Sequence, residues 1–340
     1  MAALITPSSS SSSSEYPATL PDEETGVLLI KPDDLVDHFI NHCIPPLSPS
    51  KHKGQSGKVG ILGGSEEYTG APYFAGISAL RAGADLSFIF CHPDASIAIK
   101  SYSPELIVHP LPMELNGTRV STAVPDLMSR LDSLVVGPGL GRRKDMGELV
   151  SAVIASARAR RTPIVVDGDA LWFVAQDPSI VRAHPTAVLT PNAMEFSRLY
   201  DAIFPPSSAV AKPQAPTFEE KQKPARVVEL ARALGNVTIL RKGNVDFATD
   251  GTVGFVCSVS GSLRRCGGQG DVTAGSIGTF LRWTFSSGNQ ERPPLLVAAY
   301  AGVALTKWCS DAAFQKHSRA MVASDMIQEI GPQFLEHFGQ

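Results

Sequence analysis

Short apolar runs alternate with segments of helical periodicity over most of the chain. Runs rich in Val, Ile and Leu predict buried strands, and the segments between most of them carry apolar residues at helical spacing. This strand–helix alternation predicts a mostly parallel central sheet with helices on both faces. The predicted strands are Val59–Leu62, Leu86–Cys91, Leu106–Val108, Leu134–Val136, Ile164–Val166 and Val188–Leu189. The predicted helices include Ala71–Ala84, Met146–Arg158 and Ala170–Gln176.

The pattern changes in the C-terminal part of the chain. Three closely spaced apolar runs, with Asp250-Gly251 as a tight-turn signal, predict a strand followed by a hairpin at the end of the sheet. Three helices are then expected, beginning at Asp271, Leu295 and Ala323. The three runs are Val237–Leu240, Asp246–Thr249 and Gly254–Cys257.

Two stretches fall outside this pattern. Residues 1–25 carry the serine tract Ser8–Ser14, prolines and acidic residues, so we expect a disordered tail that has nothing to bury. Residues 201–224 are rich in proline and poor in apolar side chains, which predicts a surface insertion rather than a domain boundary. Residues 26–340 are therefore expected to form a single domain.

Composition excludes several classes of protein. A 340-residue chain with 43% hydrophobic residues and a net charge of −3 can bury a large core and offers no electrostatic attraction to nucleic acid or anionic membranes. Five cysteines without a CxxC pair argue against a zinc site or a disulfide framework and fit a reducing compartment. No lysine or arginine precedes Lys31, which argues against targeting peptides, so a cytosolic location is expected.

The segment Gly267–Asp271 carries the strongest chemical signal. Its glycines stand just before the apolar run Val272–Trp283, which predicts a helix. Glycine lets backbone N–H groups approach a ligand closely, and the positive end of a helix dipole completes an anion pocket. Asp271, expected as the first helical residue, would repel a bound phosphate, yet a base acting in phosphoryl transfer needs this position. The alternative is an N-cap after a flexible loop.

Further polar groups follow other predicted strands. Gly137–Gly141 has the spacing G-x-G-x-G, which disfavours dinucleotide binding of the Rossmann kind and leaves a substrate-contacting turn or a simple tight turn. We place Asp167 in the site region and interpret Asp169 as a helix cap. Asn192 and Glu195 form a capping-box pattern, for which a structural and a functional interpretation are about equally good.

Phosphate binding by a P-loop is excluded by spacing. Gly54–Lys58 is too short for that motif, and Val59 stands where Ser or Thr belongs. Lys242 beside Gly243, after a predicted strand, is placed to meet a nucleotide phosphate, although exposed lysines at strand ends are common.

Together and in this order, six segments resemble those of the ATP-dependent NAD(P)H-hydrate dehydratases, a branch of the ribokinase-like superfamily. The resemblance extends from about Leu28 to the C-terminus. It implies a ribokinase-like three-layer α/β sandwich. It also implies a lyase that uses ATP to dehydrate the (S)-hydrate of NADH or NADPH, with release of ADP and phosphate. The segments are 53–58, 68–73, 136–141, 167–172, 190–196 and 267–271.

The resemblance also assigns roles to residues. Asp271 would be the catalytic base, and Glu195 would hold Mg²⁺ through water. The hydrated dinucleotide would contact Gly139, Asn192, Ala193, Met194, Glu195, Phe196, Ser197, Arg198 and Asp271. ATP would contact Lys242, Gly243, Asn244, Val245, Asp246, Gly261, Ser262, Leu263, Arg264, Arg265, Cys266, Gly267, Gly268, Gln269 and Gly270.

Two other functions fit parts of this pattern. A small-molecule kinase of the same fold, acting on a hydroxymethylpyrimidine or a thiazole, would leave a stable phosphorylated product. A non-catalytic dinucleotide sensor is disfavoured by Asp271, whose charge would repel phosphate. The expected partners are NADH hydrate, NADPH hydrate and ATP, without nucleic acid or membrane. The resemblance implies functional pairing with an NAD(P)H-hydrate epimerase, and a homo-oligomer is left open.

Overall fold

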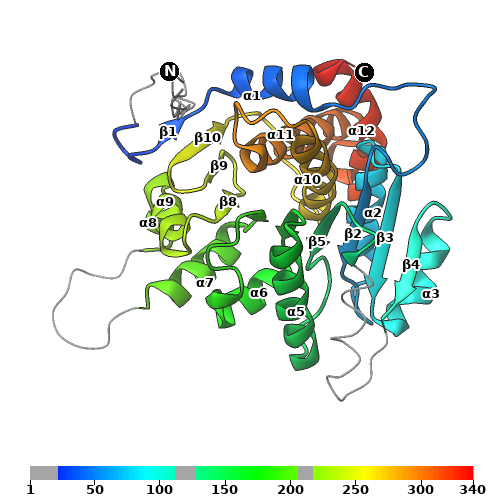
Figure 1. Cartoon of the computed structure of the whole chain (residues 1–340), viewed down its shortest axis with the longest axis horizontal. Helices are drawn as coiled ribbons and strands as arrows, with labels where there is room; N and C mark the ends of the chain where they lie inside the picture. The colour runs from blue at the N-terminus through cyan, green and yellow to red at the C-terminus, as the bar shows by residue number, and fades with distance from the viewer. Residues whose placement is uncertain (1–21, 112–127, 206–216, 340) are drawn as a thin grey trace, which may run out of the picture.

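The computed structural model describes residues 22–111, 128–205 and 217–339 (Figure 1). Its centre is a ten-stranded sheet in the order β1-β10-β9-β8-β7-β6-β5-β2-β3-β4. All neighbouring strands are parallel except β9, which runs antiparallel to β8 and β10. The strands are β1 (Leu28–Leu29), β2 (Lys58–Leu62), β3 (Leu86–Cys91), β4 (Ile107–Pro110), β5 (Ser133–Val136), β6 (Ile164–Val166), β7 (Ala187–Leu189), β8 (Thr238–Arg241), β9 (Asp246–Thr249) and β10 (Val253–Cys257).

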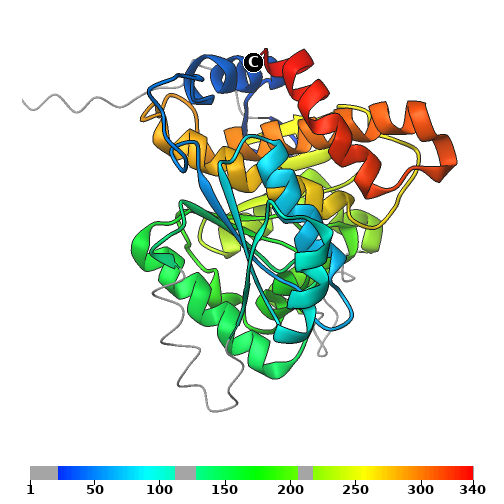
Figure 2. The ribbon, with the colours of Figure 1, turned by 90° about the vertical axis from the view of Figure 1, so that its right-hand side faces the viewer.

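Helices cover both faces of this sheet, as Figures 1 and 2 show, and the predicted mostly parallel three-layer architecture is confirmed. One face carries α1 (Pro32–His38), the π-helical turn η1 (Phe39–Cys43), α2 (Gly70–Arg81), α3 (Pro93–Tyr102), α10 (Gln269–Ser286), α11 (Pro294–His317) and α12 (Ala323–Phe338). The other carries α5 (Lys144–Arg160), α6 (Asp169–Gln176), α7 (Ala193–Ile203) and α9 (Pro224–Ala233), with the short α8 (Phe218–Lys221) between α7 and α9. Two 3₁₀ turns are η2 (Pro178–Ile180) and η3 (Ser318–Ala320).

The strands are apolar throughout because both of their faces are buried. In β6, Val165 packs into the core beneath α10 and α11, whereas Ile164 and Val166 pack into the core beneath α5 and α6. All three side chains are fully buried. Successive side chains of a strand point to opposite faces, so a sheet covered twice selects continuous apolar runs, which is the pattern in the sequence.

Two predictions about element positions are wrong. Helix α10 begins at Gln269, so Asp271 is its third residue rather than its first. The hairpin of β9 and β10 does not end the sheet, because Leu28 and Leu29 pair in parallel with β10 and form the edge. A strand of two residues is too short to show any periodicity, which is why the sequence pattern did not indicate it.

The structure also revises the ends of the two irregular stretches. Residues 22–25, expected in the disordered tail, form a turn in which Thr25 donates from its N–H and its hydroxyl to Asp22 Oδ1, each at 2.9 Å. The rest of the predicted tail lies outside the described residues. In the predicted insertion 201–224, the first residues end α7 and residues 218–221 form α8, while 206–216 lie outside the described residues. In the described chain, no helix is long and apolar enough to span a bilayer.

The strand order changes direction beside β2. The chain proceeds from β2 outward to β3 and β4 and then returns to form β5 on the other side of β2. The segments after β2 and β5 meet here, with Gly64 N–H donating to Pro138 O at 3.0 Å. A Cβ on Gly63 would lie only 2.1 Å from the same oxygen. Ligands of open α/β sheets bind beyond the carboxyl ends of the strands at such a reversal.

Close helix packing places α10 over this edge of the sheet. A Cβ on Gly275 of α10 would lie 2.1 Å from the backbone oxygen of Ala75 in α2. On the opposite side of α10, a Cβ on Gly302 of α11 would lie 2.4 Å from Cγ1 of Ile277. Glycine at these positions allows the three helix axes to approach, and this packing sets the position of the α10 N-terminus.

We expect Gly275→Ala to destabilise the protein, because an added methyl group meets backbone that cannot move aside. Overpacking of this kind costs about 1–3 kcal/mol, enough to lower Tm by about 2 °C or more. The matched control is Gly331→Ala in α12, where a Cβ has no neighbour within 4 Å. There, alanine's higher helix propensity should leave Tm unchanged or raise it. Thermal unfolding of both variants beside the parent checks this, and equal effects would contradict it.

Candidate active site

Two cavities open at the carboxyl edge of the sheet. The larger cavity, of about 660 Å³, lies where the strand order reverses. The smaller cavity, of about 360 Å³, lies beside β8 and α11. The larger cavity is lined by 65–68, Ala71, His92, 138–143, Met146, 168–169, Glu195 and Asp271. The smaller cavity is lined by Asn192, 242–244, Asp246, Gly261, Arg265, 269–270, Thr273, Val303, 306–307, Ser310 and Met326.

The N-terminus of α10 stands between the two cavities. Gly270 lines the smaller cavity and its neighbour Asp271 lines the larger one. The N-cap Gly268 has a φ of 95°, and no side chain caps the first turn, so its N–H groups remain for a ligand. A Cβ on Gly270 would lie 3.3 Å from Lys242 Nζ, so a larger residue would press on that ammonium group. This arrangement supports the predicted anion site.

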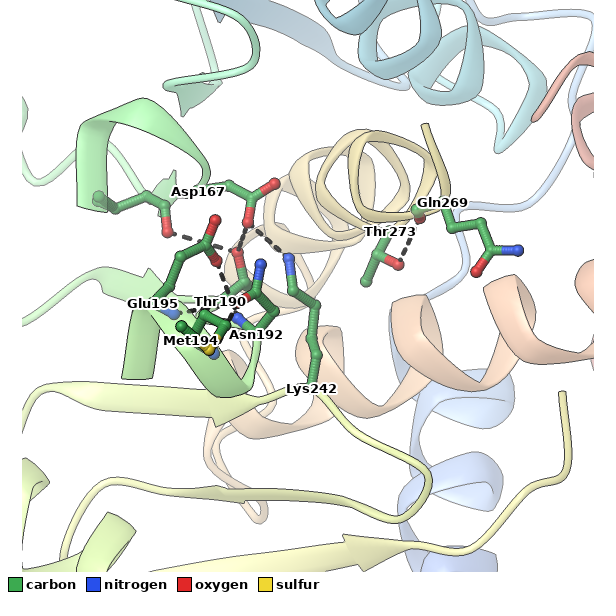
Figure 3. Close-up of polar contacts among 9 residues, drawn as sticks. Asp167, Thr190, Asn192, Met194, Glu195, Lys242, Gln269 and Thr273 are labelled. Atoms are coloured by element: carbon green, nitrogen blue, oxygen red, sulfur yellow. Dashed lines mark hydrogen bonds and ion pairs between the residues drawn. The ribbon is translucent and has the colours of Figure 1, made fainter. Parts of the chain in front are cut away.

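A largely buried ion pair lies next to this helix end (Figure 3). Lys242 Nζ is 2.6 Å from Asp167 Oδ1, and Thr190 donates its hydroxyl to the same oxygen at 2.8 Å. Asp167 is only 3% exposed. These residues follow β6, β7 and β8, whose carboxyl ends are adjacent in the sheet. The structure thus brings together Asp167 and Lys242, both predicted near the site.

The charges of this region do not balance. Burial raises the pKa of Asp271 well above its ordinary value, and the negative charge of Asp167 adds to this. The pKa of Glu195 is raised for the same two reasons. Burial works to lower the pKa of Lys242, but the carboxylates of Asp167 and Glu195 outweigh it, and the pKa is raised. One ammonium group therefore faces three carboxylates, and the excess negative charge favours a cation.

Asn192 and Glu195 form the capping box that their spacing predicted. Asn192 Oδ1 accepts from the N–H groups of Met194 and Glu195, both at 3.0 Å, and Glu195 Oε2 accepts from Asn192 N–H at 2.9 Å (Figure 3). The structural interpretation is confirmed. It leaves Glu195 Oε1 without a hydrogen bond among the described residues, in a carboxylate that lines the larger cavity.

The other residues of the first two turns of α7 do not line the cavities. Phe196 is fully buried in the core, so its side chain faces away from both cavities. Ser197 accepts a hydrogen bond from Lys221 at 3.5 Å, and the side chain of Met194 is exposed. Ala193 and Arg198 also lie outside the linings. Of the predicted dinucleotide contacts, the larger cavity therefore collects Gly139, Glu195 and Asp271.

All of the predicted ATP contacts that line a cavity line the smaller one, and some of the predicted residues hold the loops in place. Asp246 is nearly inaccessible, and its carboxylate accepts from Gly243 N–H and meets Lys307 Nζ, both at 2.7 Å. Ser262 is buried against Ser310, with 2.7 Å between their hydroxyl oxygens. The predicted contacts that do not line either cavity are Val245, Ser262, Leu263, Arg264, Cys266, Gly267 and Gly268.

The prediction that Asp169 caps α6 is wrong. The cap position is Gly168, whose φ of 53° suits glycine, and Asp169 is the first helical residue. Its carboxylate instead accepts from Gly141 N–H at 2.9 Å and from Arg142 Nε at 3.0 Å. It thereby fastens the glycine turn after β5 to the end of β6 at the wall of the larger cavity.

Lys307 is among the residues at the cavities that the sequence pattern did not identify. Lys307 of α11 is buried, donates to Asn244 O at 2.7 Å and pairs with Asp246. It orders the 242–246 loop at the smaller cavity. A single lysine within the apolar run of a predicted helix was the available signal, because a buried charge needs a partner.

Comparisons with known proteins agree on one family. A family model for NAD(P)H-hydrate dehydratase matches residues 59–332. The ATP-dependent (S)-NAD(P)H-hydrate dehydratase of Homo sapiens is 47% identical over 303 residues, covering 88% of this chain and 84% of that protein. The protein of the same name from Danio rerio is 45% identical over 308 residues, covering 90% and 89%.

Solved structures share the fold. A ribokinase-like superfamily protein from Enterococcus faecalis superposes with a TM-score of 0.72 at 18% identity, over 95% of this chain and all of that one. The ADP/ATP-dependent NAD(P)H-hydrate dehydratase from Bacillus subtilis, co-crystallized with ATP/Mg²⁺, gives 0.68 at 21% identity, over 92% and 99%.

The raised pKa of Asp271 predicts that this carboxylate destabilises the fold at neutral pH. A folded pKa above the unfolded one means that stability falls as pH rises from the unfolded pKa through the folded pKa. Asp271→Asn should therefore raise Tm at pH 8, by about 2 °C or more, and the gain should disappear at pH values below the ordinary carboxyl range. Glu148→Gln on the exposed surface of α5 removes the same charge and should change Tm little. A lower Tm for Asp271→Asn at pH 8 would contradict this account.

Proposed function

Because this chain belongs to the NAD(P)H-hydrate dehydratase family, we propose that its two cavities hold the two substrates of one reaction across the N-terminus of α10. The protein is an ATP-dependent enzyme that dehydrates the (S)-hydrate of NAD(P)H. One observation carries the assignment to these cavities: adjacent residues of one helix end, Gly270 and Asp271, line different cavities.

The larger cavity suits the hydrated dinucleotide. It lies at the reversal of strand order, and Arg142 and Arg143 at its wall offer positive charge to a pyrophosphate. The smaller cavity suits ATP, because it combines the anion-binding start of α10 with Lys242 and Arg265. In this arrangement the γ-phosphate end of ATP points toward Asp271.

Asp271 is the base of the proposed mechanism. It takes the proton of the ring hydroxyl, whose oxygen attacks the γ-phosphorus of ATP, and ADP leaves. The carbon–oxygen bond of the phosphorylated ring then breaks, phosphate leaves with the bonding electrons, and loss of a proton from the adjacent carbon restores the double bond. The free N–H groups at Gly268–Gly270 stabilise the charge that develops on the transferred group. The raised pKa of Asp271 makes this carboxylate a better proton acceptor near neutral pH than an ordinary carboxylate.

We further propose Mg²⁺ at this site, with Glu195 holding it through water. The three carboxylates facing one ammonium group, and the unbonded Oε1 of Glu195, fit a hard cation that keeps most of its water. When bound, the ion neutralises phosphate charge. Pairing with an epimerase, a homo-oligomeric state and a cytosolic location stay predictions from the sequence.

The proposed reaction requires both the nucleotide and the metal. Hydrated NADH incubated with the protein should regain its reduced-nicotinamide absorbance only when ATP and Mg²⁺ are both present. ADP and phosphate should appear in equal amounts. Full recovery without nucleotide would exclude the phosphorylation route, and a stable phosphorylated product without ring recovery would identify a kinase instead.

Asp271→Asn tests the base directly. The amide keeps the shape of the side chain but cannot accept the hydroxyl proton, and a positioned general base contributes about 10²–10⁴-fold. We therefore expect kcat to fall at least about a hundredfold, while ATP affinity stays equal or improves because a negative charge near the phosphates is lost. Glu148→Gln should match the parent in both. A kcat within about threefold of the parent would remove Asp271 from this role.

A further inference from the structure

Three side chains that can bind a metal converge far from the two cavities. His38 ends α1, His42 lies in η1, and Glu291 lies in the segment between α10 and α11. The cavities lie at the N-terminus of α10, whereas Glu291 follows its C-terminus. A helix of 18 residues is about 27 Å long, so this cluster is separate from the proposed Mg²⁺ site. Figure 1 shows α1 on the outer side of the layer that contains α10 and α11.

The ligand atoms are already close to one another. One ring nitrogen of each histidine and one carboxylate oxygen of Glu291 all lie within 4.8 Å of each other, and this is the one such group in the part of the chain that the structure describes. His38 and His42 are four positions apart, so a helical backbone places them on the same side. Their rings are in contact, with centroids 5.0 Å apart. The second histidine lies in a π-helical turn, a local distortion that is frequent at functional sites.

His38 is the buried member of this group, with 7% of the residue exposed, whereas His42 and Glu291 are exposed. The nearby cation Arg292 is paired with Asp34 at 3.5 Å.

We propose that His38, His42 and Glu291 form a zinc-binding site whose fourth position is taken by water. Two imidazoles and one carboxylate are a frequent donor set for Zn²⁺, whereas Mg²⁺ and Ca²⁺ prefer sites made of oxygen ligands. Ligands of a tetrahedral zinc ion are about 3.4 Å apart, given bond lengths near 2.1 Å. His42 and Glu291 are exposed, so rotation of their side chains can close the remaining gap around the buried His38. The cysteine spacing that argued against zinc does not bear on a site made of histidine and glutamate.

Zinc at this site would join η1 to the segment between α10 and α11. A ligand that binds only the folded state stabilises it by mass action. We therefore expect the metal-stripped full-length protein to gain about 3 °C or more in Tm when Zn²⁺ is added far above its Kd, with Mg²⁺ present at a constant excess in all samples.

Variants of the exposed ligands test the assignment. His42→Ala and Glu291→Gln should lose the Zn²⁺-dependent rise in Tm while keeping the Tm of the metal-free parent within about a degree, because surface substitutions change stability little. His52→Ala is the matched control, since His52 is an exposed histidine outside the cluster. It should retain the full rise.

Equilibrium dialysis with Zn²⁺ gives the stoichiometry. We expect about one ion per chain for the parent and for His52→Ala, and at least tenfold weaker binding for His42→Ala, on the scale expected when one ligand of a metal site is lost. Equal binding by parent and His42→Ala would overturn the proposal. Substitution of Co²⁺ for Zn²⁺ tests whether cysteines bind the metal instead. Strong sulfur-to-cobalt absorption in the parent would also overturn the proposal.

Discussion

The active region depends on the largely buried ammonium group of Lys242, which faces three carboxylates. Lys242 is 2.6 Å from Asp167, and its positive charge also acts on Glu195 and Asp271. These four residues come from the end of β6, the start of α7, the end of β8 and the start of α10. Loss of the ammonium would leave a buried Asp167 without a counter-charge, which typically costs about 3–5 kcal/mol. The local arrangement of all four elements is therefore tied to one ion pair, and the remaining negative charge contributes to the raised pKa of Asp271.

The same side chains both make structural hydrogen bonds and line the larger cavity. Glu195 caps α7 with one carboxylate oxygen and presents its carboxylate to the larger cavity. Asp169 fastens the Gly141 turn and also belongs to the cavity wall. A capping hydrogen bond fixes the direction of a side chain, so the carboxylate of Glu195 is held rigidly at the wall of the cavity. The sequence pattern presented capping and ligand binding as alternatives, whereas the structure allows both.

The sequence predicted the features that follow from burial on both faces of the sheet. The apolar run 164–166 had to be a central strand, and its end located Asp167. The sequence did not predict in the same way where individual side chains point. Phe196 belongs to a segment that resembles the family motif, yet the geometry of α7 directs its side chain into the core. Asp169 was misassigned because the cap is supplied by a backbone conformation of Gly168. The contact of Lys307 with Asp246 depends on tertiary packing, for which neighbouring residues carry no signal.

The edge strand β1 connects the beginning of the chain with its last strand. Leu28 pairs with Val253, so this pairing must wait until nearly the whole sheet has been made. During synthesis the N-terminal segment has no strand to join, and afterwards β10 exposes unpaired backbone groups until β1 arrives. Pairing of β1 with β10 thus closes a long loop, which carries an entropic cost, and a two-residue strand offers few contacts to offset it. A chain that has lost these two residues by cleavage would present an open sheet edge at β10, which is a template for association between molecules.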